Sequence, residues 1–128
     1  MSHFTDSELA YLRSGVQLAH LATVGSDGTP HVVPTGWSYN AENDTIDIGG
    51  IDLARTKKYR DIERTGRAAL VIDDVLPPWR PRGIEIRARA EVVQQPAAVI
   101  RLHPVRIVSW GLESEAIGER HARDVGAS

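Results

Sequence analysis

Basic side chains crowd into one short stretch of this sequence, "ARTKKYR", which spans residues 54 to 60. The stretch holds Lys57 and Lys58, the only lysines among the 128 residues, together with Arg55 and Arg60. Guanidinium groups can hold a phosphate through two parallel hydrogen bonds, and an ammonium group adds a compact positive charge. The stretch could therefore bind an anion, although its charge alone favours a solvated helix surface.

The basic stretch coincides with the start of a predicted helix over residues 52–66. Asp52 can cap this helix, Gly66 can end it, and Leu53 and Ile62 lie on one side of it. The first turns of a helix carry free backbone N–H groups and the positive end of the helix dipole. The residues that fall there, and that we expect to bind an anion, are Arg55, Thr56, Lys57 and Lys58.

A second unusual stretch is "HVVPTGWSYN", residues 31 to 40, where Pro34 and Gly36 interrupt a strand pattern. Proline removes a ladder donor and glycine removes a side chain, so both are poor choices for a central strand. One interpretation is a barrel corner or a bulge. The other is that the strand is open to a flat ligand, in which case Val33, Pro34 and Thr35 line the edge of a planar cofactor.

Residues that could carry out acid–base or metal chemistry on their own are scarce. The sequence has no cysteine and no GxSxG or HExxH motif, and its five histidines are scattered. No paired carboxylates suggest a glycosidase or a protease. This scarcity favours a protein whose chemistry is carried by a bound cofactor.

The three tryptophans differ in their surroundings along the chain. Trp37 follows an apolar strand, and we expect it in the core. Trp79 lies in a proline- and arginine-rich segment, and Trp110 ends the last strand pattern. Because tryptophan is enriched where apolar and polar surroundings meet, these two are candidates for a subunit interface or a pocket wall.

Length and charge exclude several broad classes. A chain of 128 residues suits a single domain, 1–128, and 25% charged with 41% hydrophobic residues argues against disorder. The net charge of −2 argues against a general nucleic-acid binder. The sequence has neither an apolar run of ~20 residues nor the apolar region of a secretion signal. We therefore expect a soluble cytoplasmic protein without nucleic-acid or membrane partners.

The alternation in "GIEIRARAEVV", residues 83 to 93, is the cleanest structural pattern. Apolar side chains alternate strictly with charged ones, which predicts a strand with one buried face. The chain as a whole predicts a mainly β fold, a small six-stranded antiparallel barrel with one or two helices. We expect strands over 16–24, 30–40, 46–50, 67–74, 83–93 and 99–111, helices over 5–15 and 52–66, a loop over 75–83, and a polar, flexible tail over 112–128.

Taken in order, these stretches resemble the pyridoxamine 5'-phosphate oxidase-like family. The matching parts are "LATV…DGTPHVVP", "KYRDI" in place of the family's K-x-R-N-L pattern, and "EIRARAEVV". The ending "SWGLE" is similar to a small actinobacterial branch of probable coenzyme F420-dependent oxidoreductases. The resemblance covers residues 8 to 113. Asp61 stands where the family pattern has Asn, and the chain lacks the C-terminal substrate-binding elements of true pyridoxamine 5'-phosphate oxidases.

The resemblance implies a split β-barrel that forms a homodimer, with two cofactor sites at the subunit interface. The flavin or deazaflavin ring would lie against the strand formed by Val32, Val33, Pro34, Thr35 and Gly36. Its phosphate would be held by Arg55, Thr56, Lys57 and Lys58. Trp79 and Trp110 of the second subunit would close the site.

The activity implied is hydride transfer between coenzyme F420 and an unidentified small organic substrate. The tail of F420 carries a phosphodiester and several glutamates, so it would suit a basic segment better than FMN would. FMN has a phosphate too. An FMN-binding oxidoreductase of the same fold and a non-catalytic carrier of either cofactor therefore remain as alternatives.

Overall fold

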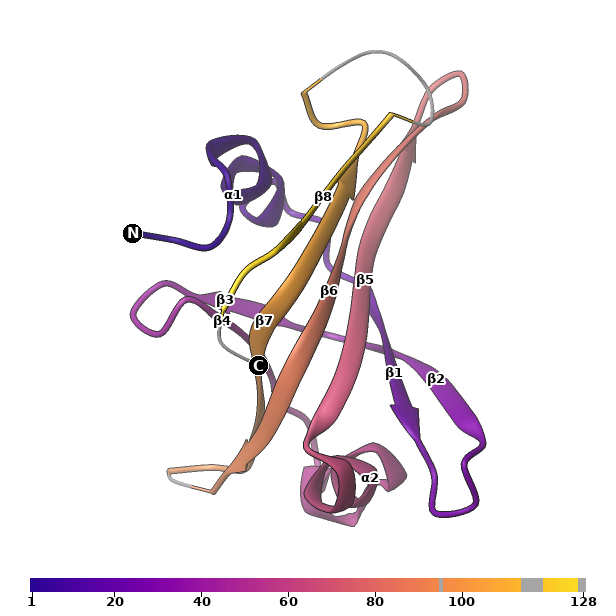
Figure 1. Cartoon of the computed structure of the whole chain (residues 1–128). Coiled ribbons are helices and arrows are strands. Elements are labelled where there is room, and N and C mark those ends of the chain that lie inside the picture. Colours follow the sequence, from indigo (N-terminus) through magenta and orange to yellow (C-terminus); the bar gives the residue numbers. More distant parts are fainter. Residues whose placement is uncertain (95, 114–118, 127–128) are drawn as a thin grey trace.

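The structure, a computed structural model, describes residues 1–94, 96–113 and 119–126. Its strands join one antiparallel sheet in the order β2-β1-β5-β6-β7-β4-β3, with β8 added beside β7 (Figure 1). The strands are β1 (Ala19–Val24), β2 (Pro30–Thr35), β3 (Ser38–Asn40), β4 (Thr45–Ile48), β5 (Arg67–Leu76), β6 (Arg80–Val93), β7 (Val99–Trp110) and β8 (Arg120–Asp124). The helices are α1 (Asp6–Leu12) and α2 (Lys57–Thr65), and a single 3₁₀ turn, η1 (Leu53–Arg55), precedes α2.

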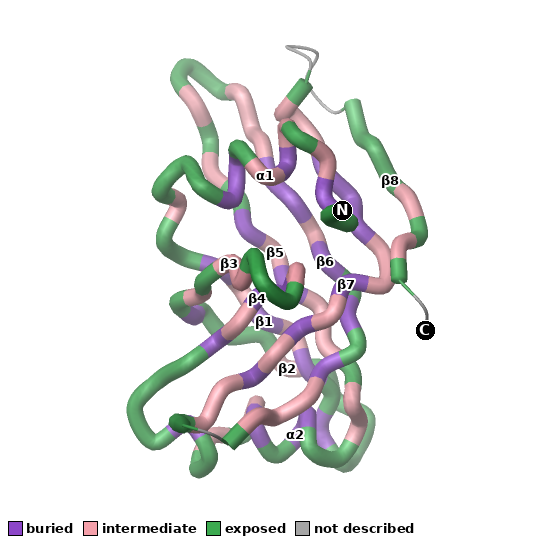
Figure 2. Tube along the Cα trace, turned by 90° about the vertical axis from the view of Figure 1, so that its left-hand side faces the viewer, coloured by how far each residue is buried: buried purple, intermediate pink, exposed green. Residues whose placement is uncertain are grey.

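The expected mainly β, antiparallel fold is confirmed, and β6 is its centre. The apolar residues of β6 face the core, where Ile84 and Ile86 are fully buried, while the arginines between them face outward. Burying each isoleucine contributes about 1.5–3 kcal/mol to folding. Figure 2 shows the same arrangement along the chain, with buried stretches in the central strands and exposed connections around them.

The two ends of the sheet are joined directly by the chain. The strands β2 and β3 stand at opposite ends of the strand order, yet only Gly36 and Trp37 separate them in sequence. The sheet therefore bends round into a barrel that is split between these two edges. Pro34 lies on β2, an edge strand, where a missing ladder donor costs least.

The expected loop over residues 75–83 is wrong. The strands β5 and β6 continue through most of it and pair as far as Leu76 and Arg80, so the turn contains only residues 77–79. The three prolines suggested a long loop, but two of them, Pro77 and Pro78, lie in the short turn itself. The third, Pro81, lies beyond the point where β7 pairs with β6, so its missing N–H breaks no bond on that side.

The expected tail is also wrong over Arg120–Asp124, which forms β8 against β7. Residues 114–118 and 127–128 of the expected tail lie outside the described residues. Arg123 of β8 reaches across to the N-terminal helix and pairs with Glu8 at 2.6 Å. The two ends of the chain are therefore tied together, and the strand count of the described residues is eight rather than six.

Candidate cofactor-binding site

The basic segment begins with a turn rather than with the helix that the sequence predicted. Asp52 has left-handed backbone angles and makes no capping bond. Thr56 is the cap instead: its hydroxyl accepts from the N–H of Tyr59 at 3.3 Å and donates to the carbonyl of Leu53 at 2.6 Å. Thr56 therefore uses its side chain to start α2, and Arg55 lies just before the helix. The predicted end of the helix at Gly66 is confirmed.

Three cations of the basic segment have no partner within the part of the chain that the structure describes. Arg55 and Arg60 are exposed and Lys58 is partly exposed, and none of the three side chains makes a hydrogen bond or ion pair there. Lys57 differs, because its Nζ lies 3.3 Å from the Asp61 Oδ1. The segment thus combines one lysine that is paired with a carboxylate of the same helix and three cations whose side chains have no such partner.

Asp61 fastens α2 to the β1–β2 hairpin, a role that sequence reasoning missed. Its carboxylate is buried and accepts from the Thr23 hydroxyl at 3.0 Å, while Arg64 approaches to 3.8 Å. Burial acts to raise the pKa of Asp61, but the hydrogen bonds from Thr23 and Lys57 and the nearby cations outweigh it and lower the pKa. Asp61 therefore stays ionised and holds the basic segment against the sheet.

The predicted ring-binding strand presents an open, largely apolar edge. Val32 is 66% exposed, and Val33, Pro34 and Gly36 are exposed as well. A methyl group placed on Gly36 would meet no atom outside its chain neighbours within 4 Å. Thr35 is the exception, since it is buried and its hydroxyl donates to the Gly36 carbonyl at 3.0 Å. A flat ring could approach this edge, but Thr35 would meet it through its backbone.

Trp79 and Trp110 lie far from the basic segment of the same chain. On the long β5–β6 ladder, the pair Arg67 and Arg89 lies beside α2, whereas the hairpin tip with Trp79 lies at the other end (Figure 1). Nine ladder steps of about 3.3 Å separate these ends, roughly 30 Å. Trp79 is 66% exposed. Trp110 pairs with Gly83, which lies opposite Asp73, six ladder steps from Arg67. Within one chain, the two tryptophans therefore do not close a site built on the basic segment.

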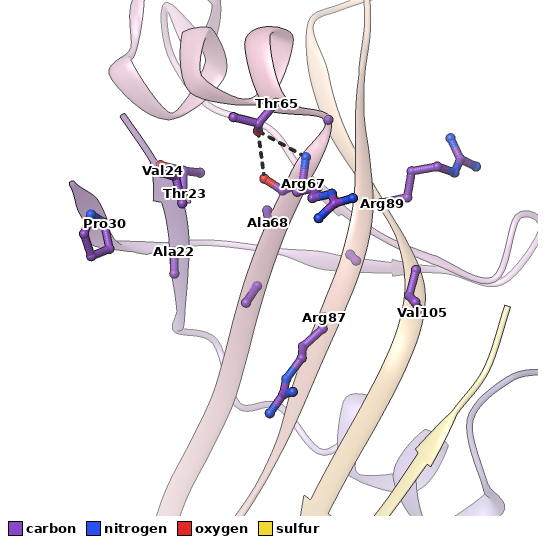
Figure 3. Close-up of a pocket in the computed structure, with 13 residues that line it drawn as sticks. Ala22, Thr23, Val24, Pro30, Thr65, Arg67, Ala68, Arg87, Arg89 and Val105 are labelled. Atoms are coloured by element: carbon purple, nitrogen blue, oxygen red, sulfur yellow. Dashed lines mark hydrogen bonds between the residues drawn. The ribbon is translucent and has the colours of Figure 1, made fainter. Parts of the chain in front are cut away.

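A cavity of about 630 Å³ on the outer face of the sheet was not anticipated from the sequence. Small side chains from β1, β5 and β6 line it, and the guanidinium groups of Arg67 and Arg87 lie beside them (Figure 3). Arg87 and Arg89 also pair with Glu85 at 3.3 Å and with Glu91 at 3.7 Å. The signal in the sequence was the combination of outward arginines on β6 with the neighbouring alanines of β5.

Within the described residues, no three His, Cys, Asp or Glu side chains converge as metal ligands would. No helix among them is long and apolar enough to cross a membrane.

Comparisons with known proteins agree with this architecture. Residues 5–125 match the family model described as pyridoxamine 5'-phosphate oxidase. A 5a,11a-dehydrotetracycline/5a,11a-dehydrooxytetracycline reductase of Streptomyces rimosus is 38% identical over 135 residues, which cover 97% of this chain and 94% of the relative.

Solved structures support the fold. A conserved hypothetical protein of Mycobacterium tuberculosis, Rv2991, superimposes with a TM-score of 0.73 at 20% identity, covering 98% of this chain and 94% of its own. A protein described as an F420 reductase superimposes with a TM-score of 0.62 at 20% identity, covering 77% and 94%. At these identities the likeness establishes the split-barrel architecture alone.

Proposed function

This chain belongs to the pyridoxamine 5'-phosphate oxidase family, and on that premise we propose that it is a coenzyme F420-dependent reductase acting on a small organic substrate. The chain is an oxidoreductase, in keeping with its family and with the reductase that is 38% identical to it. The cofactor and the substrate are the proposed parts.

The observation that carries the proposal is the set of three uncommitted cations at the start of α2, in a chain that also presents an open strand edge on β2. Arg55, Lys58 and Arg60 have no partner among the residues described, so their charge is available to the anionic tail of F420. The room at Gly36 suits a flat ring. Lys57, Asp61 and Thr56 hold this arrangement in place, because their side chains fix the start of α2.

The chain's own contribution is binding and orientation, which explains the scarcity of acid–base groups. When bound, a reduced deazaflavin supplies the hydride. The strand from Val32 to Gly36 would position the ring, and the basic segment would anchor the tail. Precise placement of the two reactants can supply a large part of the rate enhancement of such a transfer.

The outer-face cavity supports a proposal for the substrate. Ala22 of the cavity lies directly across from Val32 of the predicted ring strand, so the cavity begins beside the ring position. Its volume lies within the usual range for small-molecule sites, about 300–1,000 Å³. Since the Streptomyces relative reduces dehydrotetracyclines, we assign to this chain an electron-poor carbon–carbon double bond in a planar, polycyclic substrate.

A homodimer belongs to the same proposal. Only a second copy could bring Trp79 and Trp110 to the basic segment, and the exposed Trp79 at a hairpin tip favours such a contact. Light scattering of the purified protein tests this directly, since a mass near 28 kDa, twice the 14.0 kDa of the chain, is expected.

The proposed cofactor is tested by titrating purified protein with F420 and, separately, with FMN while following fluorescence. The expected result is tighter binding of F420 than of FMN. Arg13→Ala, which removes an exposed arginine elsewhere, is the matched control and should bind F420 as the wild type does. Tight FMN binding without a response to F420 would contradict F420 dependence. A yellow protein as purified would point to the same outcome, because FMN often stays bound.

A further inference from the structure

The turn of the β1–β2 hairpin lies against the start of α2. There it brings a side-chain nitrogen of His31 close to the side-chain nitrogen of Lys57. A Cβ atom placed on Gly25 would lie 3.0 Å from His31 Nε2 and 3.1 Å from Lys57 Nζ. The two nitrogens are therefore no more than about 6 Å apart by these distances. His31 was not among the predicted site residues, and it comes from a different element than Lys57.

Gly25 is a glycine for reasons of space rather than of backbone conformation. Unlike Gly28 in the same turn, it does not have a positive φ. Its N–H donates to the Thr29 carbonyl at 2.9 Å, as any residue could do there. Gly25 is buried, and a side chain there would require the His31 or Lys57 side chain to shift by a few tenths of an ångström. The sequence thus keeps a small space clear between two nitrogen atoms.

On the α2 side of this space, two cations share one carboxylate: Lys57 and Arg64 both face the buried Asp61. On the turn side, the exposed carboxylate of Asp27 lies near His31 and accepts from the N–H of Thr29 at 2.9 Å. Within the described residues, His31 Nε2 has no hydrogen-bond partner.

From this geometry we infer that His31 is an additional anion-binding residue, which works with Lys57 to hold the phosphate of the cofactor tail. One imidazole and one ammonium nitrogen at this spacing can each donate to a different oxygen of the same phosphate group. The inference rests on the proposed function, since it assigns a new residue to the tail end of that site. It does not depend on which of the two cofactors is bound.

The experiment compares ligands with and without the phosphate. His31→Ala should weaken F420 binding about tenfold, the usual size for one lost hydrogen bond to a charged group. It should leave the affinity for the tail-less deazariboflavin chromophore unchanged. His31→Gln, which retains a donor, should recover part of the loss. Gly25→Ala should weaken F420 binding as well, because the added methyl displaces both nitrogens.

His121→Ala is the matched control, since it removes an exposed histidine on β8 and should leave F420 affinity unchanged. Unchanged F420 affinity in His31→Ala would overturn the inference. An equal loss for the tail-less chromophore would overturn it too, by showing a structural effect.

Failure of the proposed function gives a different pattern. If the wild type binds FMN but not F420, the F420 assignment fails, and FMN against riboflavin tests His31 in the same way. If neither cofactor binds, the wild type is titrated with inorganic phosphate while the His31 imidazole is followed by NMR. A saturable shift of His31 that Lys57→Ala weakens supports the inference, and no shift overturns it.

Discussion

Two charged clusters in this molecule differ in how their charges are satisfied. Around Glu8, each carboxylate oxygen accepts two hydrogen bonds from within the chain, from Arg123 and from either the Thr5 N–H or the Ser109 hydroxyl. In the basic segment, Arg55 and Lys58 have no partner among the described residues. The Glu8 cluster is therefore closed, because its charges are paired within the chain. The basic segment is an open cluster, because cations in it have no partner there.

The difference indicates which cluster stabilises the fold and which one is available to bind a ligand. A buried charge such as that of Glu8 must be paired, since an unpaired one destabilises the fold strongly. Exposed cations remain hydrated when the chain folds, and they lose little if a ligand takes the place of water. The closed cluster should therefore determine stability, and the open one should determine cofactor affinity.

The largest expected effect comes from breaking the closed cluster. Glu8→Ala leaves Arg123 and Ser109 without their partner, and the free energy of unfolding should fall by about 3 kcal/mol. Urea denaturation measures this. Glu63→Gln, which removes an exposed carboxylate from α2, should change stability by less than about 0.5 kcal/mol. Equal effects of the two changes would mean that the Glu8 cluster does not stabilise the fold.

The roles of the two lysines in the basic segment can be told apart by replacing each one separately. Lys58→Ala should weaken F420 binding about tenfold or more, the cost of one charge-assisted contact, with little change in stability. Lys57→Ala should weaken binding and also lower the melting temperature, because it removes the ion pair with Asp61. Calorimetric titration and thermal unfolding separate the two effects. A loss of stability in Lys58→Ala without loss of affinity would reverse the assignment.

A smaller effect is expected from replacing two glycines that differ in the space around them. Gly36→Ala places a methyl in open space, so it should leave stability unchanged but weaken F420 binding by several-fold, since the methyl stands where the ring approaches. In Gly83→Ala the methyl would lie 2.7 Å from Trp110 Cζ2, which should lower stability. Unchanged F420 affinity in Gly36→Ala would place the ring elsewhere.

The smallest expected effect is a dependence of the free energy of unfolding on pH below about 4.5. Burial acts to raise the pKa of Glu8, but the hydrogen bonds from Arg123, Thr5 and Ser109 outweigh it and hold the pKa below the usual 4.5. A lowered pKa in the folded state means that the stabilisation is present above pH 4.5 and is lost as the pH falls through the folded value. Unfolding measured at descending pH should show this loss in the wild type, and Glu8→Gln should lack that contribution.

Local patterns were enough to predict much of the fold. The alternation of residues 83–93 and the end of α2 at Gly66 depend on neighbours in sequence, and both are confirmed. The start of α2 was missed because Asp52 and Thr56 are both good caps, and only the backbone angles choose between them.

Long-range contacts were beyond the reach of sequence reasoning. The contact of Arg123 with Glu8 joins residues more than a hundred positions apart, and it depends on the pairing of β8 with β7. The placement of His31 beside Lys57 depends on how a hairpin turn meets a helix. For the site, the sequence predicted the basic segment but not which of its cations remain unpaired.

The central claim is that the open cations bind the anionic tail of F420. Calorimetric titration of F420 into the wild type and into the double variant Arg55→Ala, Lys58→Ala tests it most directly. The account predicts a loss of affinity of about a hundredfold in the variant, roughly tenfold for each contact, with an unchanged melting temperature. Equal affinity in the two proteins would contradict the account and leave the basic segment as solvated surface.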